Sequence, residues 1–367
     1  MANNLSFDVK FKIKDRSAIN NNKNIIIKDT NNTNNNSSCE LKNAFFIEGG
    51  GTRGIYAIGV LRYLFQNNPY ITIDKIDIFG GTSVGSYLAA ALSFGYDSND
   101  LISVSKIIDL SELVDHKYLF VLSACRFASN GYLYNSNGRK NIIVKILEHK
   151  IDKIREHLNM PNINALDLTF GHLKKLIDLY PLIYKHLIFN SVDINRSEQI
   201  FMTTLNDKWD SLKILDGLMA SSAIPGIFNH SDFYYYPSTD CYGYDKNDEA
   251  QSVWFIDGGI DTNNPIDYFL LNYNIYHNYT IWLLKFNGKE QYVKLDGIIS
   301  YFKQIIEYLV SGKNNIKYDL VEENYHINTI NLHSKGSTLT IYSKEETEKI
   351  IDQIYQKCVD GELFFGN

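Results

Sequence analysis

Cysteine is scarce in this chain of 367 residues, and the four cysteines lie far apart. No C-x-x-C pair occurs, so the spacing predicts neither a zinc site of that type nor a disulfide framework. Reduced thiols are typical of proteins inside the cell, and we expect an intracellular protein. The cysteines are Cys39, Cys125, Cys241 and Cys358.

Long hydrophobic runs are missing too. No apolar stretch approaches the roughly 20 residues of a membrane-spanning helix. Residues 1–15 alternate charged and apolar side chains and lack the apolar core of a signal peptide. We therefore expect a protein that is soluble or peripheral to membranes and that would meet lipid from the water side.

A surplus of basic residues is also absent. Lysine and arginine number 36 against 42 aspartates and glutamates, which gives a net charge of −6. Without a dense Lys/Arg cluster, this balance argues against nucleic acid as a partner. Hydrophobic residues make up 44% of the chain, which is enough to bury a sizeable core.

What the first 40 residues do contain is asparagine. Such a segment cannot bury enough apolar area to offset its ordering entropy, so residues 1–40 are predicted to be a flexible leader. Within it, residues 7–13 and 25–27 have the composition of edge strands. Residues 41–367 are predicted to form one domain without internal repeats.

The domain opens with a strand, a glycine loop and a helix. Residues 43–48 are an apolar run of strand length, and apolar positions recur at helical spacing over residues 55–65. A second short apolar run at residues 76–79 leads into another glycine turn. This β-loop-α-β order predicts a parallel sheet in an α/β domain.

The glycine loop permits two interpretations. Gly49, Gly51 and Gly54 satisfy G-x-G-x-x-G, the dinucleotide-binding fingerprint, but the next strand lacks the acidic residue expected at its end. The alternative is an oxyanion hole, in which consecutive glycine amides converge on the oxygen of a tetrahedral intermediate. Arg53 would add positive charge near that oxygen. A serine turn one βα unit later favours the oxyanion hole over an oxidoreductase.

That serine turn is Gly81-x-Ser83-x-Gly85, which matches the nucleophile elbow. Glycines flank the serine because a side chain at either position would crowd the backbone where strand and helix meet. The helix that follows would direct free amides and its positive dipole end toward the reacting centre.

An aspartate supplies the second chemical group. Residues 253–257 read as a strand that ends at Asp257, followed by Gly258 and Gly259. We expect this carboxylate at the C-terminal tip of a parallel strand, where open α/β sheets place their sites. The apolar residues 254–256 would raise its pKa and so suit it to act as a general base.

Other segments complete the predicted architecture. A single amphipathic helix is expected over residues 139–158, either as a packed surface helix or as a cap over the site. Residues 234–244 are expected to form a tyrosine-rich loop. Further strands are predicted at residues 186–193, 198–202, 279–286 and 326–332, and further helices at 212–220, 298–310 and 344–359.

Taken together, four motifs in order resemble the patatin-like phospholipase family. Residues 49–54 resemble its G-G-G-x-[RK]-G segment, and residues 81–85 resemble its G-x-S-x-G elbow. Residues 220–225 resemble its A-S-S-A-x-P block, and residues 257–265 resemble its D-G-[GA] segment with the N-x-P that follows. The resemblance implies a three-layer α/β/α fold with a mainly parallel central sheet.

The resemblance also implies roles. Ser83 would be the nucleophile and Asp257 the base of a Ser–Asp dyad, with Gly49, Gly50, Gly51 and Arg53 at the oxyanion hole. The other motif glycines are Gly54, Gly81, Gly85, Gly258 and Gly259.

The implied substrates are phospholipids or other acyl lipids, with transient contact at a membrane surface and no metal or organic cofactor. The oligomeric state is open. A conventional triad with His230 or His277 is the rival mechanism, and a lipid- or phosphate-binding protein of the same fold, with little or no activity, is the rival function.

Overall fold

A computed structural model describes residues 8–12, 42–67, 71–113, 127, 129–288, 304–305, 308, 325–334, 340, 342–360 and 364–366. The strands are β1 (Asp8–Lys12), β2 (Lys42–Ile47), β3 (Ile78–Gly81), β4 (His186–Asp193), β5 (Glu198–Thr203), β6 (Ser231–Tyr236), β7 (Cys241–Gly243), β8 (Gln251–Asp257), β9 (Tyr279–Gly288), β10 (His326–Ser334) and β11 (Phe364–Gly366). The helices are α1 (Gly54–Asn67), α2 (Val84–Ser93), α3 (Ser98–Ser105), α5 (Asn137–Glu148), α6 (Ile151–Leu158), α7 (Phe170–Leu179), α8 (Ile214–Ser221), α9 (Asp267–Leu271), α10 (Tyr273–Tyr276) and α13 (Lys344–Val359).

One mixed sheet runs through the molecule in the order β11-β1-β10-β9-β2-β3-β4-β8-β6-β7, and β5 also pairs with β4. Its centre, from β10 to β4, is parallel. The flanking pairs β1–β10, β4–β8, β6–β8 and β6–β7 are antiparallel. The predicted parallel centre is therefore present, with antiparallel strands added on both sides.

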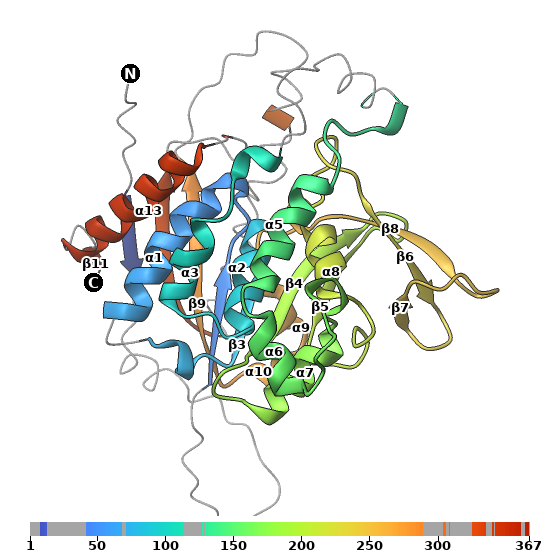
Figure 1. Ribbon diagram of the computed structural model, residues 1–367. Helices are drawn as coiled ribbons and strands as arrows, with labels where there is room; N and C mark the ends of the chain where they lie inside the picture. The colour runs from blue at the N-terminus through green and yellow to red at the C-terminus, as the bar shows by residue number, and fades with distance from the viewer. Residues whose placement is uncertain are drawn as a thin grey trace, which may run out of the picture.

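Strand β2 shows how the layers form. Its side chains alternate between two cores: Phe45 and Ile47 lie in the larger one, with residues of α1, α2 and α13. Ala44 and Phe46 lie in a second core that includes Phe269 of α9. A strand buried on both faces reads as a continuous apolar run, and helices cover both of its sides (Figure 1).

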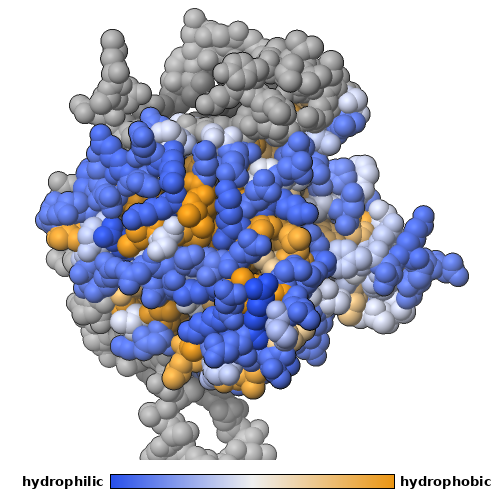
Figure 2. Space-filling model, in the orientation of Figure 1, coloured by the Kyte–Doolittle hydropathy of each residue, from blue (hydrophilic) through white to orange (hydrophobic). Residues whose placement is uncertain are grey.

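Helices cover the face of the molecule seen in Figure 1. Polar side chains cover most of this face, and apolar residues show in scattered patches among them (Figure 2). In the described part of the chain, no helix combines the length and apolarity needed to cross a membrane.

Three expectations need correction. The single helix expected over residues 139–158 is two helices, α5 and α6, and α5 buries its apolar face in the core. The tyrosine-rich segment 234–244 is largely a β-hairpin of β6 and β7 at the edge of the sheet, where Tyr242 stacks on Trp209 with ring centroids 4.5 Å apart (Figure 1). Strand β8 runs antiparallel to β4, although a parallel strand was expected.

Two further expectations concern segments described in part or not at all. Of the leader, residues 8–12 form β1, which confirms a strand within residues 7–13, but β1 is not at the edge because it pairs with both β10 and β11. Residues 25–27 lie outside the described part of the chain. Within the helix expected at residues 298–310, only residues 304, 305 and 308 are described.

Candidate active site

Ser83 lies between strand β3 and helix α2, in an unusual backbone conformation. Its φ of 52° and ψ of −125° put a non-glycine residue in a region that such residues rarely occupy. The residue is 3% exposed, and the Ser83 amide donates to Ser221 Oγ at 3.1 Å. Strain of this kind persists only where the surroundings enforce it, and it is concentrated at functional sites.

The glycines around Ser83 are required by close backbone contacts. A Cβ on Gly81 would lie 2.3 Å from the carbonyl of Gly85, and a Cβ on Gly85 would lie 2.3 Å from the carbonyl oxygen of Ile47. The end of β2 thus packs directly against the elbow. This packing brings the glycine loop after β2 beside Ser83.

Asp257 ends strand β8 and is completely buried. Its register partner is Ser191, near the C-terminal end of β4. The carboxylate therefore lies at the same end of the strands as the elbow, even though β8 runs antiparallel to β4. The backbone amide of Asp257 donates to the Ala223 carbonyl at 3.0 Å. Its Oδ1 accepts a 2.8 Å hydrogen bond from the Gly259 amide.

Burial raises the pKa of the Asp257 carboxyl to about 6, while the Gly259 amide, the Ser83 hydroxyl and the Arg139 charge oppose the rise. Oδ2 is buried and accepts no hydrogen bond of normal geometry from the described residues, so Ser83 lies near this oxygen without being hydrogen-bonded to it. Such contacts often tighten only when substrate binds. Of the neighbours expected to bury Asp257, Phe255 and Ile256 are buried, but Trp254 is 47% exposed because strand alternation directs it outward.

The glycine loop divides into two parts. The Gly49 amide donates to the Asn263 carbonyl at 3.0 Å, and Asn263 Nδ2 donates back to the Gly49 carbonyl at 2.8 Å. Gly51 has a φ of 55° and begins a short 3₁₀ turn that ends at Arg53. For Gly50 and Gly51, the described residues supply no acceptor to the amides.

Asn190 of β4 is a site residue that sequence reasoning missed. Its Oδ1 accepts a hydrogen bond from the Thr82 hydroxyl, and its Nδ2 donates to the Thr262 carbonyl at 2.8 Å. One buried amide therefore ties the elbow to the loop after Asp257. The available signal was a polar residue inside the apolar run of a buried strand.

Arg139, Tyr87 and Ser222 were also missed as site residues. Tyr87 and Ser222 share a 2.5 Å hydrogen bond, and Arg139 Nη1 donates to Ser222 Oγ at 3.0 Å. For Arg139 the sequence signal was a charge on the apolar face of a helix, three residues before Ile142 and four before Ile143.

Comparison with known proteins assigns the family. Residues 45–270 match the patatin-like phospholipase family, a span that contains all four motifs. The chain belongs to the patatin-like phospholipase family.

Relatives of this patatin-like protein occur in viruses. It is 45% identical over 334 residues to an uncharacterised protein of Acanthamoeba polyphaga mimivirus, covering 89% of this chain and 90% of the relative. It is 25% identical over 304 residues to a probable lipid hydrolase of Invertebrate iridescent virus 6, covering 82% and 85%. The crystal structure of VipD from Legionella pneumophila has the same fold, with a TM-score of 0.50 and 14% identity over 88% of this chain and 66% of that one.

The histidines considered for a triad have other contacts in this patatin-like phospholipase. His230 stacks on Trp254 at 4.1 Å, and its Nε2 lies 3.0 Å from Asp232. His277 is exposed. No histidine is among the groups that shift the pKa of Asp257.

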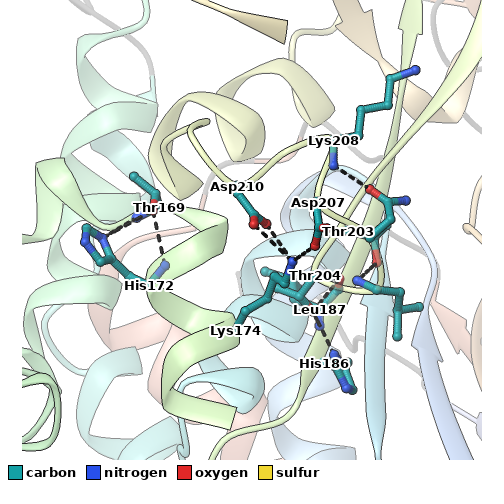
Figure 3. A network of polar contacts seen from close by, with 12 residues as sticks. Thr169, His172, Lys174, His186, Leu187, Thr203, Thr204, Asp207, Lys208 and Asp210 are labelled. Atoms are coloured by element: carbon teal, nitrogen blue, oxygen red, sulfur yellow. Dashed lines mark hydrogen bonds and ion pairs between the residues drawn. The ribbon is translucent and has the colours of Figure 1, made fainter. Parts of the chain in front are cut away.

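Two other histidines belong to a polar network that includes neither Ser83 nor Asp257 (Figure 3). In it, His172 Nδ1 accepts from the Thr169 amide at 3.2 Å, and His186 Nδ1 lies 3.1 Å from Thr204 Oγ1. Among the described residues, no group of three or more His, Cys, Asp or Glu side chains is placed to hold a metal ion.

Proposed function

We propose that this patatin-like phospholipase hydrolyses acyl esters of lipids, as a phospholipase A or lysophospholipase does, with Ser83 and Asp257 as its catalytic dyad. One observation carries the proposal: a serine on a strained elbow lies beside a fully buried carboxylate whose pKa is about 6. Family membership and the name of the iridescent virus relative support the same reaction class.

In the first step, Ser83 Oγ attacks the carbonyl carbon of the ester and its proton passes to the carboxylate of Asp257. Oδ2 suits this role because Oδ1 is already held by Gly259. The tetrahedral intermediate then collapses, the carbon–oxygen bond to the alcohol breaks, and the leaving oxygen takes the proton from Asp257. An acyl-serine remains.

In the second step, Asp257 takes a proton from water as that water attacks the acyl-serine carbon. The bond to Ser83 Oγ breaks, the proton returns to that oxygen, and a carboxylic acid leaves. A pKa of about 6 keeps the carboxylate ionised at neutral pH yet basic enough to accept a proton.

The oxyanion would bind at the glycine loop. The amides of Gly50 and Gly51 are the best placed donors, since the Gly49 amide is already bonded to Asn263. Gly49 would instead hold the loop against Ser83, and the Arg53 charge would favour the anion. Preorganised donors of this kind each contribute about 2.7–4 kcal/mol to transition-state stabilisation.

Long-chain lipid substrates are presented by micelles and membranes, so the proposal includes transient contact with such a surface. The β6–β7 hairpin is one described element that projects from the edge of the sheet (Figure 1).

The test is labelling with a fluorophosphonate probe, followed by hydrolysis of phospholipid and lysophospholipid. Ser83→Ala should abolish labelling, and Asp257→Asn should lower kcat by at least about a thousandfold because the amide cannot accept the proton. Ser93→Ala is the matched control, because Ser93 is a buried serine on the same helix that bonds the His186 carbonyl.

Labelling that survives Ser83→Ala would identify another nucleophile. Failure of the intact protein to label or to hydrolyse any lipid would favour the rival function, a binding protein of the same fold.

A further inference from the structure

Arg139 of helix α5 is a buried cation next to the candidate dyad. It is 2% exposed, and within the described residues no carboxylate forms an ion pair with it. Nη1 donates to the carbonyl of Met219 at 3.0 Å and to Ser222 Oγ at 3.0 Å. Burying an unpaired charge costs several kcal/mol, so its position calls for an explanation.

The remaining contacts of Arg139 fix its orientation. Nη2 donates to Ser136 Oγ at 3.0 Å and to the Asn229 carbonyl at 3.3 Å. The guanidinium also lies 4.5 Å from the ring centroid of Phe228. With one face on an aromatic ring and four oxygen partners, the head group is held in a single place.

Through Ser222, Arg139 reaches a segment that contacts both dyad residues. Residues 221–223 comprise the last residue of helix α8 and the two residues after it. Ser221 Oγ accepts from the amide of Ser83, and the Ala223 carbonyl accepts from the amide of Asp257. Ser222, between them, is held by Arg139 from α5 and by the Tyr87 hydroxyl from α2.

We propose that Arg139, Tyr87 and Ser222 form a buried brace that positions Ser83 and Asp257 relative to each other through residues 221–223. The inference rests on the proposed function, because it assigns a purpose to this geometry only if those two residues react. The three are positioning residues, since none of them contacts the reacting atoms. A misplacement of about 1 Å at a catalytic group can cost a hundredfold in rate.

The brace also affects the protonation of Asp257. The groups that face Asp257 are the Arg139 cation from α5, the Tyr87 hydroxyl from α2 and the Ser83 hydroxyl from the elbow. The Arg139 charge lowers the pKa of Asp257, so its removal would raise that pKa further. Because the base works as a carboxylate, the acid limb of the pH–rate profile would then move to higher pH.

The test compares kcat and KM for p-nitrophenyl butyrate in Tyr87→Phe, Ser222→Ala and their double variant, with folding checked by thermal unfolding. Each single variant should lower kcat about tenfold or more and leave KM within about twofold. The double variant should be no slower than about the slower single variant, because the residues act as one unit. Tyr96→Phe is the matched control, since this buried tyrosine donates to the Ile146 carbonyl instead.

Arg139→Met and Arg139→Lys supply the second readout. Arg139→Met should shift the acid limb to higher pH, and Arg139→Lys should restore its position because the charge returns. If Arg139→Met does not fold, the Tyr87 and Ser222 cycle decides the question alone.

The outcomes separate the two proposals. Hydrolysis that depends on Ser83 but is unchanged in kcat by Tyr87→Phe and Ser222→Ala would overturn the brace and leave the proposed function standing. So would losses that multiply in the double variant. Absence of any Ser83-dependent hydrolysis would overturn the proposed function, and the brace with it.

Discussion

At the scale of single residues, the candidate site contains two residues whose conformation or burial destabilises the folded protein. Ser83 has a strained backbone, which costs about 1–3 kcal/mol. Asp257 is a carboxylate buried with few partners. Departures of this kind are concentrated where function requires them, so they mark the same candidate site that the motifs indicate.

The pKa of Asp257 leads to a stability prediction. The carboxyl titrates at about 6 when folded and at 3.8 ordinarily, so between these values the folded state binds more protons than the unfolded state. Stability therefore falls as pH rises through this window, by on the order of 3 kcal/mol in total. Asp257→Asn removes the charge, and it should stabilise the protein by up to about this amount at neutral pH and by little below about pH 4.

Urea unfolding at several pH values measures this effect. Asp193→Asn is the control, because Asp193 is a buried carboxylate that accepts from Arg196 Nε at 2.9 Å. Its loss should destabilise the protein at neutral pH, which is the opposite sign. Equal changes for Asp257→Asn at pH 4 and at neutral pH would contradict the assignment of the raised pKa.

At the scale of elements, the site depends on how closely strand ends approach one another. Gly85 lies in the first turn of α2, and a Cβ there would be 2.3 Å from the Ile47 carbonyl oxygen and 2.7 Å from that of Glu48. Within a helix, alanine is ordinarily about 1 kcal/mol more favourable than glycine. At this position glycine is preferred instead, because the carbonyl groups at the end of β2 and of the next residue leave no room for a Cβ.

Gly85→Ala should therefore destabilise the protein by more than about 4 kcal/mol or prevent folding, as measured by urea unfolding and soluble yield. Gly131→Ala is the comparison: its φ is 80°, but its Cβ would meet nothing within 4 Å. That variant should lose only about 1–2 kcal/mol from backbone strain. Similar losses in the two variants would mean that contact at the elbow is not the cause.

At the scale of the whole molecule, the sheet joins distant parts of the chain. Gly49 and Asn263 are 214 residues apart and hydrogen-bonded, and β1 near the N-terminus pairs with both β10 and β11. The candidate site lies between β2, β3, β4 and β8, several strands from β1. Stability contributed by β1 should therefore be separable from catalysis.

Deleting residues 1–13 should lower the unfolding midpoint and promote aggregation, because β10 loses a partner and exposes an unpaired edge. The kcat of the remaining folded protein should stay within about twofold of the intact value. Deleting residues 31–36, a nearly pure asparagine stretch, is the control and should change neither. A large loss of kcat after the first deletion would show that β1 acts on the site.

The sequence alone determined the locally encoded parts of this protein. The strand, glycine turn and helix around Ser83 were predictable because neighbouring residues dictate such turns, and the apolar runs identified most strands to within a few residues. The four motifs also led to the patatin-like family.

Only the tertiary structure decided which elements meet. The antiparallel direction of β8, the hairpin at residues 231–243, and the convergence of Asn190 and Arg139 on the site all depend on pairing and packing between distant segments. Periodicity indicates which face of a helix or strand is buried, but not which element packs against that face. The role of a polar side chain in an apolar run is therefore unexplained until its hydrogen-bond partner is known.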